Sequence, residues 1–143
     1  MKLSEADRGL LSVLRENARA STAEIARRLG MSRTTVHSRI ERLERQGVIA
    51  GYTVRMGSAA ERGHIRAHIM ITVAPKQMPA VVDALHAMPE LRALHSVSGP
   101  FDLVALAMAP GVEDMDALTD RIGALDGVER TTSSIVLSAK FER

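Results

Sequence analysis

Apolar residues recur at helical spacing through the first 47 residues of this 143-residue chain, which predicts three consecutive helices. Ser4 is a suitable N-cap for the first helix, and Asp7 lies in its first turn, where the helix dipole favours a carboxylate. One stripe of this helix is apolar: Leu10, Leu11, Leu14 and Ala18. We expect that stripe to face the core of a small helical domain.

Residues 21–47 (STAEIARRLGMSRTTVHSRIERLERQG) predict two further helices joined by a sharp turn. Gly30 supplies the left-handed conformation that commonly ends a helix, and Ser32 is a strong N-cap for the next one. Apolar residues share one side of each helix: Ile25, Ala26 and Leu29 in the first, and Val36, Ile40 and Leu43 in the second. Two short helices around a glycine turn predict a helix-turn-helix.

The other positions of the second of these helices carry hydrogen-bond donors and almost no acid before Glu41. Arginine engages guanine edges bidentately in the major groove, whereas Ser and Thr bind base edges or phosphates, and a helix N-terminus attracts phosphate. The candidate DNA contacts are Ser32, Arg33, Thr34, Thr35, His37, Ser38, Arg39 and Arg42. A solvated amphipathic surface helix is the other interpretation of this pattern.

A change of pattern separates two modules. Residues 48–55 (VIAGYTVR) predict a short strand that serves as a small wing or as part of a dimer contact. Residues 56–64 (MGSAAERGH) contain two glycines and small polar residues, which predicts a linker. We therefore expect a helix-turn-helix DNA-binding domain at residues 1–55 and a second domain at residues 65–143.

The second module alternates strand and helix signals. Residues 65–73 (IRAHIMITV) alternate with a period of two, which is typical of a strand with one buried face. The other expected elements are a helix over 78–88, strands over 91–97 and 101–109 joined at Ser98-Gly99-Pro100, a helix over 112–125 and a last strand over 131–140. The order βαββαβ predicts a ferredoxin-like α+β fold with helices on one face of its sheet.

The bare face of such a sheet favours self-association. Apolar residues on that face need to be covered, and two identical faces related by a two-fold axis form a closed dimer. A dimer also places two helix-turn-helix units on half-sites about one helical turn apart, or a multiple of that distance. A monomer whose sheet face is polar is the other possibility.

Charge is distributed unevenly along the chain. Residues 1–66 hold 13 Lys and Arg against 7 acids (+6), and residues 67–143 hold 6 against 10 (−4), which sum to the net charge of +2. Phosphate neutralisation gives a physical reason for the basic excess, so we expect double-stranded DNA as a partner. The only aromatic residues are Tyr52, Phe101 and Phe141, which argues against a stacking platform for single strands.

The composition limits other functions. The chain has no Cys, which excludes disulfides, thiolate zinc sites and Cys nucleophiles. No apolar run reaches the roughly 20 residues needed to span a bilayer, and the N-terminus lacks an apolar signal core, so we expect a cytoplasmic protein without membrane contact. His64 and His68 lack a third ligand at sensible spacing, and no nucleophile elbow or phosphate cradle is present. We therefore expect neither enzyme activity nor a metal or cofactor.

Four segments are distinctive in combination: EADRGLLSVLRENAR, EIARRLGMSRTTVHSRIERLERQGVIAGY, SGPFDLVALAMA and GVERTTSSIVLSAK. With them, the chain from Leu3 to Phe141 resembles the Lrp/AsnC (leucine-responsive, feast/famine) family of bacterial and archaeal transcriptional regulators. The resemblance implies a winged-helix-type N-terminal domain and a RAM-type, ACT-like C-terminal domain for oligomerisation and amino-acid sensing. It also implies dimers that assemble further, commonly into octamers, with small-molecule pockets between dimers.

The resemblance further implies where an amino-acid effector binds: Ser98, Gly99, Pro100, Phe101, Asp102, Thr131 and Ser133. The Asp102 carboxylate suits an ammonium group, and the Gly99 backbone and the hydroxyls of Thr131 and Ser133 suit a carboxylate. This chain has Ser133 where members often carry Thr, and Leu103 where they often carry Tyr. A hairpin turn shaped by Gly99 and Asp102 without any ligand is the other interpretation.

These expectations combine into a sequence-specific transcriptional regulator whose DNA binding or assembly responds to an amino acid or a related small effector. The alternative is a ligand-independent architectural protein whose oligomer wraps DNA.

Overall fold

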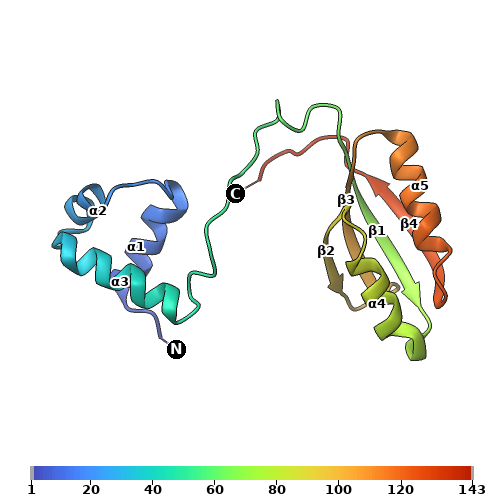
Figure 1. The fold of residues 1–143 in the computed structure, drawn as a ribbon, viewed down its shortest axis with the longest axis horizontal. Helices are drawn as coiled ribbons and strands as arrows, with labels where there is room; N and C mark the ends of the chain where they lie inside the picture. Colours follow the sequence, from blue (N-terminus) through green and yellow to red (C-terminus); the bar gives the residue numbers. More distant parts are fainter. Residues whose placement is uncertain (1, 143) are drawn as a thin grey trace. The chain divides into compact units, whose positions relative to one another are not determined.

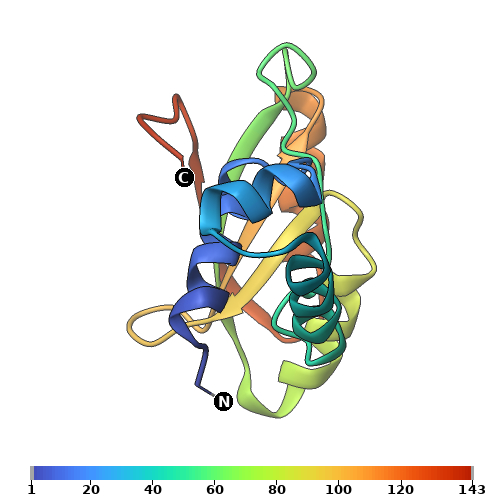
Figure 2. The same cartoon turned by 90° about the vertical axis from the view of Figure 1, so that its left-hand side faces the viewer.

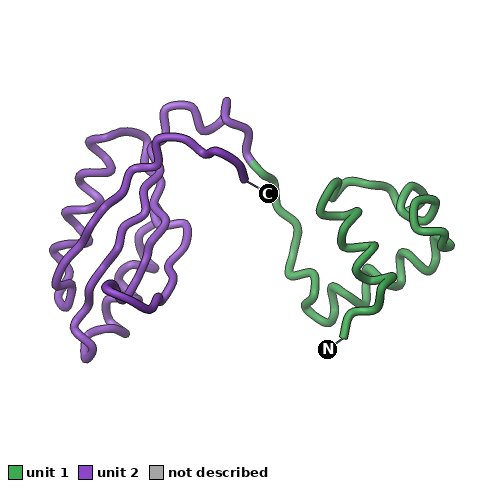
Figure 3. Tube along the Cα trace, turned by 180° about the vertical axis from the view of Figure 1, so that it is seen from behind, with its two compact units in different colours: residues 1–55 green, residues 56–143 purple. Residues whose placement is uncertain are grey.

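The computed structural model describes residues 2–142, and the chain divides into two compact units, Met1–Arg55 and Met56–Arg143 (Figure 3). Three helices form the first unit: α1 (Glu5–Glu16), α2 (Thr22–Leu29) and α3 (Arg33–Arg45), seen from two directions in Figures 1 and 2. The second unit contains a four-stranded sheet and two helices.

Local capping explains where the helices of the first unit begin and end. Ser4 and Asp7 form a reciprocal capping box, in which each backbone N–H donates to the other's side chain at 3.1 Å. Gly30 ends α2 in the left-handed conformation (φ 64°), and the Ser32 hydroxyl accepts from the backbone N–H of Thr35. These capping residues agree with the sequence analysis.

The core of the first unit joins all three helices through six buried apolar residues: Leu10, Val13, Ile25, Ala26, Val36 and Leu43. The stripe expected on α1 is partly corrected, because Val13 is buried while Leu11 and Leu14 are only half-buried. Ala18 is exposed, since α1 ends at Glu16 before reaching it.

The strand expected at residues 48–55 is wrong, because no strand forms in this described stretch. Val48 and Ile49 instead donate their backbone N–H groups to the Leu43 carbonyl, at 2.9 and 3.1 Å, and pack against the helical core. Residues 50–57 follow as exposed backbone without a pairing strand. A β-strand needs a neighbouring strand for its hydrogen bonds, and the described chain provides none at this position.

The second unit has the βαββαβ order expected from the sequence. Its elements are β1 (Ile65–Val73), a 3-10 turn (Pro75–Gln77), α4 (Met78–His86), β2 (Leu91–Ser96), β3 (Leu103–Ala109), α5 (Val112–Gly123) and β4 (Val128–Ile135). The sheet is antiparallel in the order β2-β3-β1-β4 (Figure 1). This is the ferredoxin-like arrangement, in which the first and third strands are central.

Both helices of this unit pack on one face of the sheet. Alternate residues of β1 and β3 are buried beneath them: Ala67, Ile69, Ile71 and Val73 from β1, and Leu103, Ala105, Ala107 and Ala109 from β3. The helices contribute Val81, Leu85, Met115, Leu118 and Ile122 to the same core. The period of two in residues 65–73 therefore predicted the buried face of β1 correctly.

Strand ends differ from the sequence-based expectations. β3 begins at Leu103 rather than Phe101, and β4 covers 128–135 rather than 131–140. β4 pairs only with β1, from Val73 opposite Val128 to Ala67 opposite Ile135. Beyond Ile135 only one backbone bond to β1 follows, from Val136 N–H to the Arg66 carbonyl at 2.8 Å, because β1 itself begins at Ile65.

Candidate DNA-binding helix and effector loop

The N-terminal half of α3 presents a polar, acid-free surface. Arg33, Thr34, His37 and Ser38 are exposed on it, and the first turn of the helix contains no acidic residue. Its N–H groups at the N-terminus are satisfied only in part by Ser32, so this end of the helix retains positive character. Such a surface suits a polyanion.

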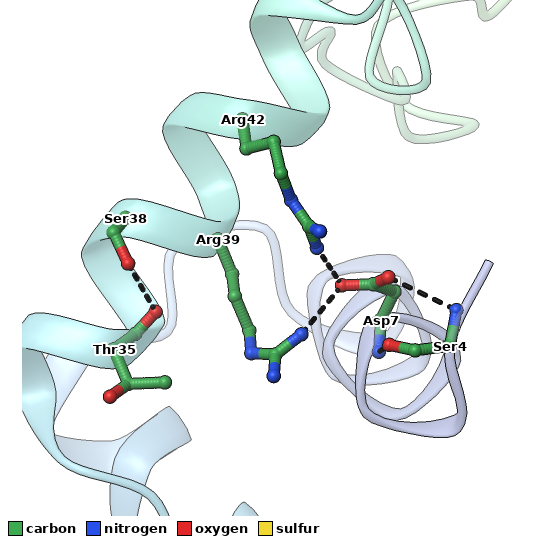
Figure 4. Close-up of polar contacts among 6 residues, drawn as sticks. All are labelled: Ser4, Asp7, Thr35, Ser38, Arg39 and Arg42. Atoms are coloured by element: carbon green, nitrogen blue, oxygen red, sulfur yellow. Dashed lines mark hydrogen bonds and ion pairs between the residues drawn. The ribbon is translucent and has the colours of Figure 1, made fainter.

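Several hydroxyls of this surface are already ordered by the helix. The Ser32 and Thr35 hydroxyl oxygens lie 2.8 Å apart, and Thr35 is half-buried. The Ser38 hydroxyl donates to the Thr35 carbonyl at 3.2 Å (Figure 4). His37 lies 3.3 Å from Glu41 one turn later, an ion pair when the imidazole is protonated. Ser32, Thr35 and Ser38 therefore hold defined positions near the start of α3.

Arg39 and Arg42 depart from the sequence-based expectation that they face DNA. Both guanidinium groups reach the Asp7 carboxylate on α1: Arg39 Nη1 lies 3.0 Å from Oδ1, and Arg42 Nη2 binds the same oxygen (Figure 4). The structure thus directs these two side chains to another helix of their own unit. Spacing along α3 alone could not show this, since the partner lies 32 and 35 residues away.

Asp7 is held in its ionised form by this environment. Its side chain is only 5% exposed, and its Oδ2 atom accepts from the Ser4 backbone N–H at 3.1 Å. Hydrogen bonds from Ser4 and Arg39, with the nearby charge of Arg42, lower the pKa of Asp7 although burial opposes this. The sequence analysis assigned Asp7 to the helix dipole and missed the two arginines.

The proposed effector loop joins β2 to β3. Ser98, Gly99 and Pro100 are exposed, Phe101 and Asp102 are half-buried, and Gly99 adopts φ 105°, a conformation that favours glycine. The Arg130 guanidinium lies 5.6 Å from the centre of the Phe101 ring, which links the loop to the start of β4 by a cation–π contact.

Asp102 has a structural role in this loop. Its Oδ2 atom accepts from the Val73 backbone N–H at 2.8 Å, and its own N–H donates to the Ile71 carbonyl at 3.0 Å. Its carbonyl accepts from the Val97 N–H at 3.0 Å, which closes the hairpin. Asp102 thereby ties the hairpin to the end of β1, as the turn-shaping interpretation expects.

The structure separates the two β4 residues expected at the effector site. Thr131 lies opposite Ile71 of β1, so Thr131 and Asp102 flank Ile71 from its two sides. Ser133 lies opposite Ile69 and borders a hollow of about 250 Å³ beside α5. That hollow is lined mainly by apolar groups: Ile65, Val112, Met115, Asp116, Thr119, Ser133 and Ile135.

Among residues 2–142, no three His, Asp or Glu side chains are grouped so that they could hold a metal ion. The helices of that described range include none that is long and apolar enough to cross a membrane.

Both units match family models. Residues 3–50 match a winged helix-turn-helix DNA-binding domain, and residues 66–143 match the Lrp/AsnC ligand binding domain. The chain belongs to the Lrp/AsnC family. It is therefore a transcriptional regulator with a DNA-binding unit followed by a ligand-binding unit, as the sequence resemblance indicated.

Relatives support this Lrp/AsnC assignment along nearly the full length. The chain is 31% identical over 136 residues to the HTH-type transcriptional regulator LrpA of Pyrococcus horikoshii, covering 94% of this chain and 96% of LrpA. It is 30% identical over 137 residues to an uncharacterized HTH-type transcriptional regulator of Pyrococcus furiosus, covering 96% and 93%. Both relatives are named as regulators rather than enzymes.

Solved structures confirm the fold. E. coli AsnC matches with a TM-score of 0.92 at 25% identity, covering 100% of this chain and 97% of AsnC. A transcriptional regulator from Neisseria meningitidis, solved as a complex with L-Met, matches with a TM-score of 0.91 at 22% identity, covering 99% and 94%.

Proposed function

We propose that this Lrp/AsnC regulator reads DNA with the first two turns of α3. The observation that carries the proposal is the exposed, acid-free cluster of Arg33, Thr34, His37 and Ser38 behind the Ser32 cap. The unit that bears it holds 11 basic and 6 acidic residues, a formal charge of +5. Arg33 is the member best suited to a bidentate contact with guanine, and the Ser32 and Thr35 hydroxyls at the helix N-terminus are suited to a phosphate.

Arg33→Ala tests this proposal. Its specific affinity should fall by about 1–3 kcal/mol, roughly 5- to 150-fold, because a bidentate base contact is lost. Arg92→Ala is the matched control, since it removes the same charge from an exposed position on β2 in the other unit. Fluorescence anisotropy with a duplex selected from a random-sequence library measures both. Equal affinities for Arg33→Ala and Arg92→Ala would remove Arg33 from the interface.

We infer that the ligand-binding unit takes an amino acid at the hairpin loop of residues 98–102. One Asp102 carboxylate oxygen binds Val73, and the other is suited to an ammonium group. The exposed Gly99 backbone and the Thr131 hydroxyl are donors suited to a carboxylate. Ser133 lies two residues further along β4 beside the α5 hollow, so it plays no part in this proposal.

Thermal unfolding against a panel of free amino acids tests the ligand proposal. A ligand at 100 times its dissociation constant should stabilise the native state by about 2.7 kcal/mol. L-methionine is the first candidate, because the Neisseria relative was solved with it. No shift with any amino acid, together with binding to unrelated DNA only a few-fold weaker than to the selected site, would favour the architectural alternative.

The helix-free face of the sheet supports a further proposal, that the regulator is at least a dimer. Apolar residues at the centre of that face are half-buried and lie on neighbouring strands: Met70 on β1, and Val104, Leu106 and Met108 on β3. Pairing two such faces about a two-fold axis would cover them. Size-exclusion chromatography with light scattering gives the mass directly, and a monomer mass of 15.5 kDa would refute the proposal.

A further inference from the structure

Asp7 is the only buried polar or charged residue among those the structure describes. A capping box needs one of its oxygens, and Oδ2 fills that role by accepting from the Ser4 N–H. The other oxygen, Oδ1, receives guanidinium groups from both Arg39 and Arg42. Asp7 therefore has a second connection, to the helix proposed to read DNA.

The two arginines lie about one turn apart on α3, and Arg39 directly follows the exposed residues His37 and Ser38. Their side chains are 29% and 39% exposed, so they remain near the surface while their charged ends are directed to α1 (Figure 4). An arginine that extends into solvent is free to move toward a phosphate oxygen, whereas a guanidinium that donates to the Asp7 carboxylate is held in place beside α1.

Stability alone does not account for this arrangement. The Nε atoms of Arg39 and Arg42 are both buried without a hydrogen-bond partner in the described chain, and a buried unpaired donor is unfavourable. Breaking a buried ion pair is costly, but replacing it with apolar residues of similar size is often neutral or stabilising. The cluster of Asp7, Arg39 and Arg42 therefore calls for a functional explanation in addition to a structural one.

We propose that Asp7 is a specificity-determining positioning residue that withholds Arg39 and Arg42 from the DNA backbone. Phosphate contacts bind all sequences equally, whereas base contacts discriminate among them. With both arginines bound to Asp7, α3 offers its base-reading residues without two additional non-specific cations. This inference rests on the proposed DNA-binding surface of α3.

The substitution Asp7→Asn tests the inference, because it keeps the shape of the side chain and removes its charge. Glu5→Gln is the matched control: it lies in the same first turn, is exposed, and changes the net charge equally. Full-length proteins are first compared by circular dichroism. Affinity for the selected duplex and for a scrambled duplex is then measured over a series of salt concentrations.

For Asp7→Asn we expect tighter binding to the scrambled duplex and a smaller ratio of specific to non-specific affinity. The slope of log K against log salt should steepen by about 0.9 for each arginine that gains a phosphate, so by about 1 to 2 in total. Glu5→Gln should change the slope much less. Equal weakening on both duplexes with an unchanged slope would overturn the inference and leave Asp7 as a structural residue only.

Arg42→Gln provides a test that does not depend on the folding of Asp7→Asn, since Arg39 still pairs with Asp7. A slope equal to that of the wild type supports the inference, because Arg42 then touches no phosphate. A slope shallower than that of the wild type by about 0.9 overturns the inference, because Arg42 then contacts a phosphate in the wild type. These results are distinct from a failure of the proposed DNA surface, which would show instead as unchanged binding by Arg33→Ala.

Discussion

Substitutions of Asp102 can distinguish a role in shaping the turn from a role in binding an effector. Its Oδ2 atom accepts the Val73 backbone N–H at 2.8 Å, and the residue is half-buried. Asp102→Ala leaves that N–H without its acceptor, which we expect to cost about 1–3 kcal/mol. For a unit of this size, each kcal/mol lowers the melting temperature by about 4–8 °C.

Asp102→Asn should behave differently, because its amide oxygen can still accept from Val73. We expect its unliganded melting temperature to stay close to that of the wild type. Its charge is lost, however, so the ammonium group of an amino acid has no carboxylate partner. The stabilisation of about 2.7 kcal/mol expected for the wild type at 100 times the dissociation constant should therefore be much reduced.

The assay is thermal unfolding of wild type, Asp102→Asn and Asp102→Ala, each with and without the amino acid that stabilises the wild type. A ligand shift retained in full by Asp102→Asn would refute the ammonium–carboxylate reasoning and leave Asp102 as a turn residue. An unliganded Asp102→Asn as unstable as Asp102→Ala would refute the reasoning about the Val73 hydrogen bond.

Two further predictions concern stability. The lowered pKa of Asp7 stabilises the first unit at pH values above the unfolded carboxyl pKa of about 3.9, and this contribution is lost as the pH falls through the lower folded value. As the pH is lowered below about 4, the free energy of unfolding should therefore fall less for Asp7→Asn than for the wild type. Urea unfolding followed by circular dichroism measures both. Gly127→Ala should destabilise the second unit by more than about 1 kcal/mol, because Gly127 has φ 99° and an added Cβ would lie 2.5 Å from Gln77 Cβ. Gly123→Ala, in open space at the end of α5, is the control and should be neutral or stabilising; equal losses in the two variants would contradict the prediction.

Features set by neighbouring residues were predictable from the sequence. The Ser4 cap depends on a residue three positions away, and Gly30 needs only its own left-handed backbone. The period of two in β1 follows from a strand with a helix-covered face and a bare face. Each of these signals lies within a few residues of the feature that it determines.

Features set by distant partners were not predictable in the same way. β4 is an edge strand with no buried residue and only two half-buried ones, so its ends depend on its register with β1 rather than on its own pattern. Residues 48–55 contain strand-forming residues but have no strand to pair with in the described chain. The contacts of Asp7 with Arg39 and Arg42 span more than 30 residues, and the helical spacing of α3 is compatible with either direction for those side chains.

Each unit of this regulator has one aspartate whose carboxylate joins two of its elements at or next to the surface proposed to bind a partner. Asp7 joins α1 to α3, and Asp102 joins the hairpin to β1. An alanine substitution at either position removes a structural acceptor and a charge together, so loss of DNA or effector binding would not tell the two roles apart. Asparagine keeps the acceptor and removes the charge. Under our proposals, Asp7→Asn should strengthen non-specific DNA binding, whereas Asp102→Asn should weaken effector binding. General destabilisation would not produce these opposite outcomes.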